Sequence, residues 1–169
     1  MQIGIVFCCF IPLHQGHLSL INRAIKENST VIIGVCGYDD DRGKDFLPFI
    51  TRYELMKNKY KNNPNIIVVQ IDDKKIGLTG KFDSRSWKAW CKELFTNANI
   101  DPNNNTCCWY TGEEHYASKL SELYPYHYII VADKSKINIS GTKIRKDPLK
   151  NKKFIDKDFY QYLKGKKKL

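Results

Sequence analysis

The sequence predicts an α/β fold: a Rossmann-like, doubly wound sheet of about five parallel strands with helices on both faces. Two observations lead to this prediction. Short apolar runs rich in β-branched residues recur along the chain, as expected of strands that are covered on both faces. Segments with apolar residues at helical spacing separate these runs, which is typical of parallel strands joined by helical crossovers.

The first half of the chain supplies three strands and two helices. Ile3–Cys9 is continuously apolar, so it predicts a buried strand, and Gly16–Lys26 carries its apolar residues at helical spacing. Thr30–Cys36 is the second expected strand, and a polar, acidic loop follows it. Thr51–Tyr60 is the next expected helix, with Thr51 as its N-cap. Ile66–Ile71 is the third expected strand.

The second half continues the same alternation. Ser84–Phe95 predicts a helix, and a turn-rich connector over residues 97–105 follows it. Thr106–Thr111 and Tyr128–Val131 are the expected fourth and fifth strands, with a helix over Glu113–Leu123 between them. Ligands bind beyond the carboxyl ends of the strands in such a sheet, so functional residues are expected directly after each strand.

The positive charge of the chain is concentrated near its C-terminus. The sequence has 169 residues, with 28 Lys and Arg against 18 Asp and Glu, a net charge of +10. Residues 143–169 hold 11 basic and 3 acidic residues (+8), whereas residues 1–142 hold 17 and 15 (+2). A nucleic-acid surface normally runs along a folded face, so nucleic acid is not an expected partner. We expect one domain over residues 1–150, with residues 151–169 as its C-terminal helix and basic tail.

The chain also lacks the features of membrane and secreted proteins. No apolar run approaches the ~18 residues that a membrane span requires, and Ile3–Phe10 has no basic flank of the kind a signal peptide carries. The six cysteines show no CxxC spacing. The adjacent pairs Cys8–Cys9 and Cys107–Cys108 place their side chains on opposite faces of strands. We therefore expect a cytoplasmic protein with reduced thiols and no membrane partner.

The first strand leads into His14-Gln15-Gly16-His17. The two histidines are three apart and share one face of the first helical turn. Gly16 allows a ligand to approach the backbone closely, and a helix N-terminus attracts phosphate. A zinc site needs more ligands than these two, and the remaining histidines, at 115 and 127, lie in distant segments. The motif therefore predicts a phosphate site without a metal held by the protein.

A second candidate phosphate-binding segment follows the fifth strand. It reads Ile139-Ser140-Gly141-Thr142-Lys143-Ile144-Arg145 and contains two good N-cap residue types, Ser140 and Thr142. Basic residues at a helix start are disfavoured by the helix dipole, and a bound polyanion would offset this. Together, the two segments predict a triphosphate held between two helix N-termini.

These two segments resemble the HxGH and ISxTxxR motifs of the nucleotidylyltransferase superfamily. Over roughly residues 3–150 the chain is also similar to the nicotinamide-nucleotide adenylyltransferase domain of NadR-type proteins. Gly37–Arg42, Trp87–Trp90 and Tyr110–Glu114 contribute to this similarity. The resemblance implies transfer of an adenylyl group from ATP to the 5′-phosphate of nicotinamide mononucleotide. The products are NAD and pyrophosphate, and Mg²⁺ binds mainly through the ATP phosphates.

The resemblance also implies roles for individual residues. The reaction is expected to proceed by direct in-line attack without a covalent intermediate. The expected catalytic residues are His14, His17 and Arg145. The expected ATP-binding residues are Phe10, Gly16, Asp133, Ile139, Ser140, Gly141 and Thr142. The expected acceptor-binding residues are Asp40, Arg52, Trp87, Tyr110 and Glu113. Trp87 is expected to stack on the nicotinamide ring, where a cation–π interaction is worth ~0.5–2 kcal/mol, and Trp90 is expected in the core.

Two other functions stay open at this point. The first is nucleotidyl transfer to a different phosphorylated acceptor, such as phosphopantetheine or a phosphosugar alcohol. The second is a nucleotide-sensing or nucleic-acid-binding module that uses the lysine-rich tail at residues 164–168. The sequence also leaves open whether the acid analogue of the mononucleotide is accepted and whether the protein forms a homo-oligomer.

Overall fold

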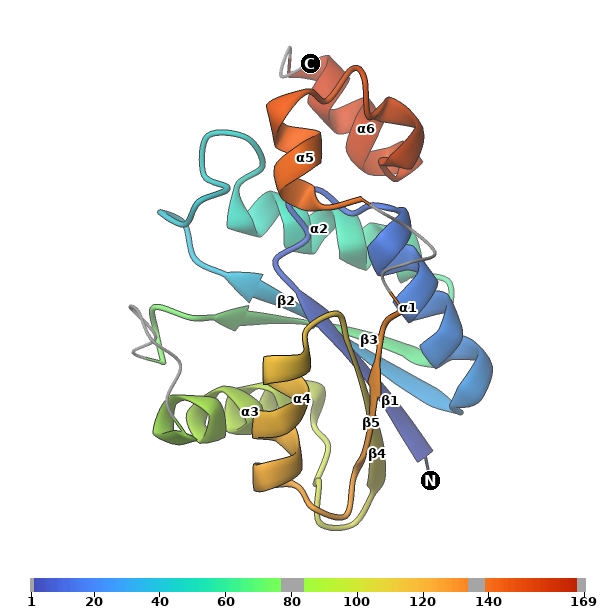
Figure 1. The fold of residues 1–169 in the computed structure, drawn as a ribbon, viewed down its shortest axis with the longest axis vertical. Coiled ribbons are helices and arrows are strands. Elements are labelled where there is room, and N and C mark those ends of the chain that lie inside the picture. The colour runs from blue at the N-terminus through green and yellow to red at the C-terminus, as the bar shows by residue number, and fades with distance from the viewer. Residues whose placement is uncertain (1, 77–83, 134–138, 167–169) are drawn as a thin grey trace.

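The computed structural model describes residues 2–76, 84–133 and 139–166, and it contains one five-stranded parallel sheet (Figure 1). The strand order is β3-β2-β1-β4-β5, and every pairing is parallel. The predicted fold class is therefore confirmed. The strands are β1 (Gln2–Cys8), β2 (Thr30–Gly37), β3 (Ile66–Asp72), β4 (Thr106–Thr111) and β5 (Tyr128–Val131).

Helices cover both faces of this sheet (Figure 1). α1 and α2 pack on one face and α3 and α4 on the other, while α5 and α6 lie beyond the carboxyl ends of the strands. In the described part of the chain, no helix is long and apolar enough to cross a membrane. The helices are α1 (Gln15–Glu27), α2 (Phe49–Tyr60), α3 (Ser84–Ala98), α4 (Glu114–Leu123), α5 (Gly141–Lys146), the short 3₁₀ helix η1 (Lys152–Phe154) and α6 (Lys157–Gly165).

The two faces of the sheet form two separate hydrophobic cores. Alternation along β4 shows the division, because Cys108 and Tyr110 enter the core beneath α1 and α2, whereas Cys107 and Trp109 enter the core beneath α3 and α4. Successive side chains of a strand point to opposite faces, so the expected separation is confirmed for Cys107 and Cys108. It is not confirmed for Cys8 and Cys9, because β1 ends at Cys8 and Cys9 packs against both cores. All six cysteines are free thiols.

The start of α2 differs from the prediction. The helix begins at Phe49, with Pro48 as its N-cap residue, so Thr51 lies inside the first turn and not at the cap. Pro48 has φ −55° and its carbonyl oxygen accepts the amide N–H of Arg52 at 3.1 Å. Proline is favoured at a helix start because its ring presets φ and it has no N–H to leave unpaired.

The strand order reverses at β1, and this reversal positions the site. β1 pairs with β2 on one edge and with β4 on the other, and the connections that follow these strands leave for opposite faces. Doubly wound sheets bind ligands in the crevice at such a switch point. Immediately beyond β1, Phe10 has φ +48°, a left-handed conformation that is rare for a bulky residue and that clusters at functional sites.

Candidate functional site

A cavity of about 600 Å³ opens at the carboxyl ends of β1, β4 and β5. The β1–α1 connection, the start of α5 and the β4–α4 connection line it. The two predicted phosphate-binding segments, which are more than 120 residues apart, therefore meet at one site. All of the predicted catalytic and ATP-binding residues lie along this wall: Phe10, His14, Gly16, His17, Asp133, Ile139, Ser140, Gly141, Thr142 and Arg145.

His14 and His17 form a stacked pair at the start of α1. Their ring centroids are 3.8 Å apart with an interplanar angle of 22°. His14 is the N-cap residue, and its Nδ1 accepts the amide N–H of Gly16 at 3.1 Å. An acceptor nitrogen carries no proton, so a neutral His14 ring carries its proton on Nε2. The cap thus leaves His14 with one N–H donor.

Burial keeps both imidazoles uncharged. Desolvation, and to a smaller extent the neighbouring charge of His17, together lower the pKa of His14 from 6.5 to about 3. Desolvation alone lowers the pKa of His17 from 6.5 to about 4. Two imidazolium rings could not stack this closely without strong repulsion, so the stacking and the low pKa values agree. Near neutral pH the pair can donate hydrogen bonds but adds no positive charge.

The N-terminus of α5 forms the opposite wall. Ser140 is its N-cap residue, and its Oγ accepts the amide N–H of Lys143 at 3.3 Å. Arg145 spans the two walls, because its Nη1 donates to the carbonyl oxygen of Ile11 at 2.8 Å and its Nη2 donates to Thr142 Oγ1 at 3.1 Å. These bonds hold the guanidinium group against the β1–α1 connection.

Gly141 brings the two walls into direct contact. A Cβ atom at this position would lie 2.7 Å from the carbonyl oxygen of Ile11 and 3.0 Å from Nη1 of Arg145. Only glycine permits so close an approach between the two backbone segments. In this structure the close approach at Gly141 is between two segments of the protein, and close access of a ligand to its backbone stays a prediction.

Arg42 is a cavity residue that the sequence reasoning did not single out. It comes from the loop after β2 and lines the cavity together with Arg145. Burial lowers the pKa of Arg145, and the positive charge of Arg42 lowers it further. Two guanidinium groups close enough to affect each other favour a polyanionic ligand between them. One signal in the sequence could have indicated Arg42: it is a single basic residue directly after the three consecutive aspartates at 39–41.

The structure does not bring Arg52 or Asp40 to the cavity. Arg52 is fully buried, and its guanidinium group is paired with the buried carboxylate of Asp41 and donates to the carbonyl oxygens of Cys9 and Cys36. The expected phosphate contact is thus replaced by a structural network. Asp40 points to solvent, with a side chain that is 71% exposed and an Oδ2 atom 3.9 Å from Nζ of Lys74.

Trp87 and Tyr110 also lie elsewhere than expected. Trp87 is 2% exposed and packs with Phe7, Trp90 and Tyr116 in the core beneath α3 and α4, so its ring has no open face for a ligand. Trp90 is in the core as expected.

Tyr110 faces the opposite core. Its hydroxyl group donates to Glu27 Oε2 and accepts from Asn28 Nδ2, both at 2.8 Å and both at the far end of α1. Of the expected acceptor-binding residues, Glu113 alone lines the cavity. The aromatic side chains on the cavity wall itself include Phe7 and Tyr116.

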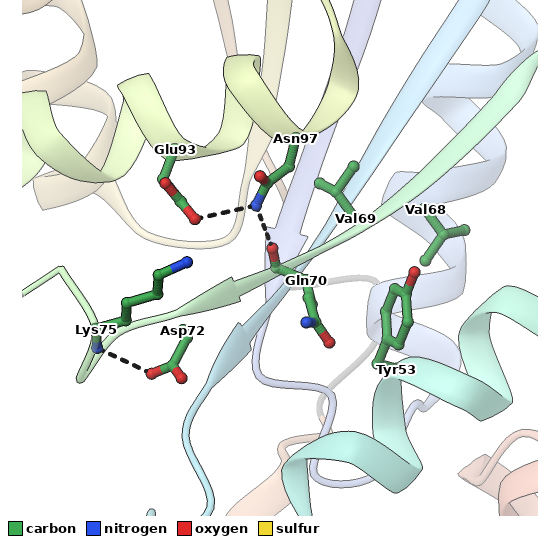
Figure 2. Close-up of a pocket in the computed structure, with 8 residues that line it drawn as sticks. All are labelled: Tyr53, Val68, Val69, Gln70, Asp72, Lys75, Glu93 and Asn97. Carbon is green, nitrogen blue, oxygen red and sulfur yellow. Dashed lines mark hydrogen bonds between the residues drawn. The ribbon is translucent and has the colours of Figure 1, made fainter.

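A second, smaller hollow of about 360 Å³ lies along the outer edge of β3, between α2 and α3 (Figure 2). Asn97 bridges it by donating to the carbonyl oxygen of Gln70 at 2.9 Å and to Glu93 Oε1 at 3.3 Å. Lys75, Asp72 and Tyr53 complete its polar lining. None of the predicted site residues lies here, so the cavity at the switch point is the candidate site.

The fold and this cavity define an α/β protein with a polyanion-binding site at the switch point of its sheet. Residues 5–147 match the family model described as cytidylyltransferase-like. The chain belongs to this family, within the nucleotidylyltransferase superfamily.

Curated relatives agree with this membership. The trifunctional NAD biosynthesis/regulator protein NadR of Salmonella typhimurium is 29% identical over 170 residues, which cover 91% of this chain and 38% of that protein. The phosphopantetheine adenylyltransferase of Bacteroides thetaiotaomicron is 36% identical over 63 residues, which cover 37% of this chain and 40% of that protein. The chain thus spans about two fifths of the length of these relatives.

Solved structures show the same architecture. A crystal structure of NadR protein in complex with NR has a TM-score of 0.76 and 30% identity, covering 94% of this chain and 44% of that one. A bifunctional NMN adenylyltransferase/ADP ribose pyrophosphatase from Francisella tularensis has a TM-score of 0.69 and 18% identity, covering 97% and 49%. The latter likeness concerns the fold alone.

Proposed function

We propose that this chain transfers the adenylyl group of ATP to the 5′-phosphate of nicotinamide mononucleotide, which gives NAD and pyrophosphate. The observation that carries the proposal is the convergence of two helix N-termini, a neutral histidine pair and two arginines on one cavity. That set of donors suits a triphosphate. The names of the NadR relatives, and of a NadR structure in complex with NAD and AMP-PNP, support the choice of substrates.

The proposed reaction is a direct displacement at phosphorus. An oxygen of the mononucleotide 5′-phosphate attacks the α-phosphorus of ATP and forms a new P–O bond. The bond from that phosphorus to the oxygen bridging to the β-phosphorus breaks, and pyrophosphate leaves with the electron pair. Little proton transfer is needed, so the rate enhancement comes from positioning and electrostatic stabilisation.

The cavity residues divide this work between its two walls. His14 and His17 donate hydrogen bonds to phosphate oxygens near the reacting phosphorus, and Gly16 adds its backbone to that wall. Arg145 and Arg42 stabilise the negative charge of the triphosphate, and a rigid guanidinium fork can do so bidentately. The remaining proposed ATP contacts are Phe10, Asp133, Ile139, Ser140, Gly141 and Thr142.

Nucleophilic catalysis by the cavity thiols is disfavoured. Burial raises the pKa of Cys9 to about 12 and also raises the pKa of Cys8. The thiolate is the reactive form of cysteine, so neither side chain is a good nucleophile near neutral pH. A reaction without a covalent intermediate is consistent with this chemistry.

We further propose Mg²⁺ as the cation that accompanies ATP. Glu113 and Asp133 are the carboxylates among the described residues of the cavity wall. Mg²⁺ prefers oxygen ligands and takes most of them from phosphates and water, so one or two carboxylates are enough. When bound, the ion neutralises part of the triphosphate charge. The described residues contain no group of three or more His, Cys, Asp or Glu side chains that could hold a metal alone.

The proposed catalytic unit comprises residues 1–150 together with the C-terminal segment. α6 contributes Phe159 and Leu163 to the core beneath α1 and α2, and Asp156 pairs with Lys59 of α2 at 2.7 Å. We expect removal of residues 151–169 to expose that core and to destabilise the domain. The residues after Lys166 lie outside the described part of the chain.

Acceptor-dependent release of pyrophosphate tests the proposal. ATP and Mg²⁺ are supplied with nicotinamide mononucleotide, its acid analogue, phosphopantetheine or glycerol 3-phosphate. We expect turnover with nicotinamide mononucleotide and a loss of about 10²-fold or more in kcat for His17→Ala. The control is His127→Asn, because His127 lies outside the cavity, where its Nδ1 accepts Trp109 Nε1–H at 3.1 Å.

The outcomes separate the candidate functions. Turnover with phosphopantetheine alone would favour the activity named for the Bacteroides relative and overturn the proposed acceptor. ATP binding without turnover on any acceptor would favour a nucleotide sensor.

A further inference from the structure

An unusual contact joins the floor of the cavity to the histidine pair. Cys8 is the last residue of β1, and its Sγ lies 3.0 Å from Nε2 of His17. Both side chains line the cavity. The ring of His17 is also stacked on His14, and its centroid lies 5.1 Å from that of Phe10 in an edge-on arrangement. The ring is therefore held by an aromatic neighbour on each of two sides and by a sulfur atom at Nε2.

The other ring nitrogen indicates where the proton lies. Nδ1 of His17 is buried and has no hydrogen-bond partner among the described residues. A proton on Nδ1 would create a buried N–H without an acceptor, which is rare in folded proteins and destabilising. A proton on Nε2 instead gives an N–H group that faces the sulfur of Cys8. The contacts thus favour the Nε2–H tautomer, with sulfur as the acceptor.

The surroundings of the Cys8 sulfur keep it an uncharged thiol. Burial raises the pKa of the Cys8 thiol, while backbone hydrogen bonds from Phe10 and Cys9 and the charges of Arg42 and Arg52 act in the opposite direction. The sulfur therefore stays an uncharged thiol surrounded by hydrogen-bond donors. A thiol sulfur is a weak acceptor, whereas a phosphate oxygen is charged and forms much stronger hydrogen bonds.

We propose that Cys8 is a positioning residue for His17: its sulfur accepts the Nε2–H bond and holds the ring in place until a phosphate oxygen takes over as acceptor. The second half of this statement rests on the proposed function, because it requires a phosphorylated substrate at the cavity. The first half concerns the free protein alone. Cys8 itself makes and breaks no bond in the reaction.

The test reads the tautomer of each histidine directly. Ring nitrogens with and without a proton have distinct ¹⁵N chemical shifts, and at pH 7 His17 is neutral because its pKa is about 4. We expect the Nε2–H tautomer for His17 in the free wild-type protein. In Cys8→Ala we expect a mixture of the two tautomers, whereas Cys8→Ser, which keeps an acceptor, retains the Nε2–H form. His14 stays unchanged throughout, because Gly16 fixes its tautomer.

Kinetics then test the role in catalysis. A loosened ring lowers kcat roughly tenfold in Cys8→Ala, while the KM for ATP stays within about twofold and Cys8→Ser recovers most of the loss. Cys107→Ala is the matched control, because Cys107 is a buried strand thiol in the opposite core. Addition of ATP and Mg²⁺ to the wild-type protein should shift the Nε2 resonance as oxygen replaces sulfur.

The inference is overturned by a His17 ring protonated on Nδ1 in the free wild-type protein, or by the same tautomer in Cys8→Ala as in the wild type. A folded Cys8→Ser variant that loses the Nε2–H form would also contradict it. The tautomer measurement needs no acceptor substrate. An Nε2–H ring in a protein that turns over no acceptor would therefore count against the proposed function and leave the contact between Cys8 and His17 intact.

Discussion

At the scale of single residues, burial decides what each polar side chain can do. His14 and His17 are titratable groups that stay neutral near pH 7, because the protein removes them from water. Arg42 and Arg52 both follow β2 in the chain. Arg52 is buried in an ion pair with Asp41, whereas Arg42 lines the cavity. Residue type predicts the chemistry that is available, and only the packing around each residue determines where that chemistry is used.

The low histidine pKa values predict a loss of stability in mild acid. Both groups have a pKa near 6.5 when unfolded and about 3 to 4 when folded, so the unfolded chain gains protons first as the pH falls. The stabilisation is complete above pH 6.5 and is lost as the pH falls toward the folded-state values. By pH 5 each histidine removes about 2 kcal/mol from the free energy of unfolding. Urea unfolding at pH 7 and pH 5 measures this.

The matched control for that measurement is the double variant His14→Gln, His17→Gln. Its free energy of unfolding should change much less between pH 7 and pH 5 than that of the wild-type protein. An equal change in both proteins would show that other groups cause the acid sensitivity.

The two arginines give a contrast between stability and ligand binding. Arg52→Met leaves the buried carboxylate of Asp41 without its partner, and breaking such a pair lowers the free energy of unfolding by about 3–5 kcal/mol. Arg42→Met removes a cavity charge and should change stability by no more than about 0.5 kcal/mol, while raising the Kd for ATP about tenfold. Calorimetry measures both quantities. A reversed pattern would mean that Arg52 is the ligand-binding residue.

At the scale of elements, the site depends on how closely α5 approaches the connection after β1. Gly141 of α5 lies against the carbonyl oxygen of Ile11, and Arg145 bonds to the same oxygen one turn later. Because the two residues are one helical turn apart, Gly141 can contact the connection after β1 while the guanidinium group of Arg145 binds the same connection. The two walls of the cavity are set by this junction.

Gly141→Ala tests the junction. The new methyl group would lie 2.7 Å from a backbone oxygen that cannot rotate away, so α5 must shift. We expect the Kd for ATP to rise about tenfold, since each 1.4 kcal/mol of lost binding energy is a factor of ten. Gly165→Ala at the end of α6 is the control, because a Cβ atom there would meet no described residue within 4 Å apart from its chain neighbours and the backbone of its own helix. Unchanged ATP binding in Gly141→Ala would show that the close contact is not needed.

The elements were largely predictable from the sequence, and the acceptor pocket was not. Apolar periodicity indicated the five strands, and β4 and β5 have the predicted bounds. The two phosphate motifs were predictable because each combines a helix start with small and donor residues. The positions of the Tyr110 and Trp87 side chains were not predictable. Each side chain packs into a core that forms only when the helices pack against the sheet. The local sequence did not distinguish Trp87 from a ligand-stacking residue, although it indicated that Trp90 lies in the core.

At the scale of the whole molecule, topology brings together two motifs from opposite ends of the chain. The strand order β3-β2-β1-β4-β5 places β1 at the switch point, and α5 returns to its carboxyl end after β5 is complete. The cavity therefore forms only when both β1 and α5 are folded and packed together. The central claim is that this cavity transfers the nucleotidyl group of ATP, with attack at the α-phosphorus.

Isotope labelling tests that claim most directly. ATP labelled at the α-phosphorus or at the γ-phosphorus is incubated with Mg²⁺, nicotinamide mononucleotide and the wild-type protein, and the products are separated. We predict that the α-label appears in the dinucleotide and the γ-label in pyrophosphate. Transfer of the γ-label to the acceptor would contradict the account, because the site would then catalyse phosphoryl transfer in place of nucleotidyl transfer.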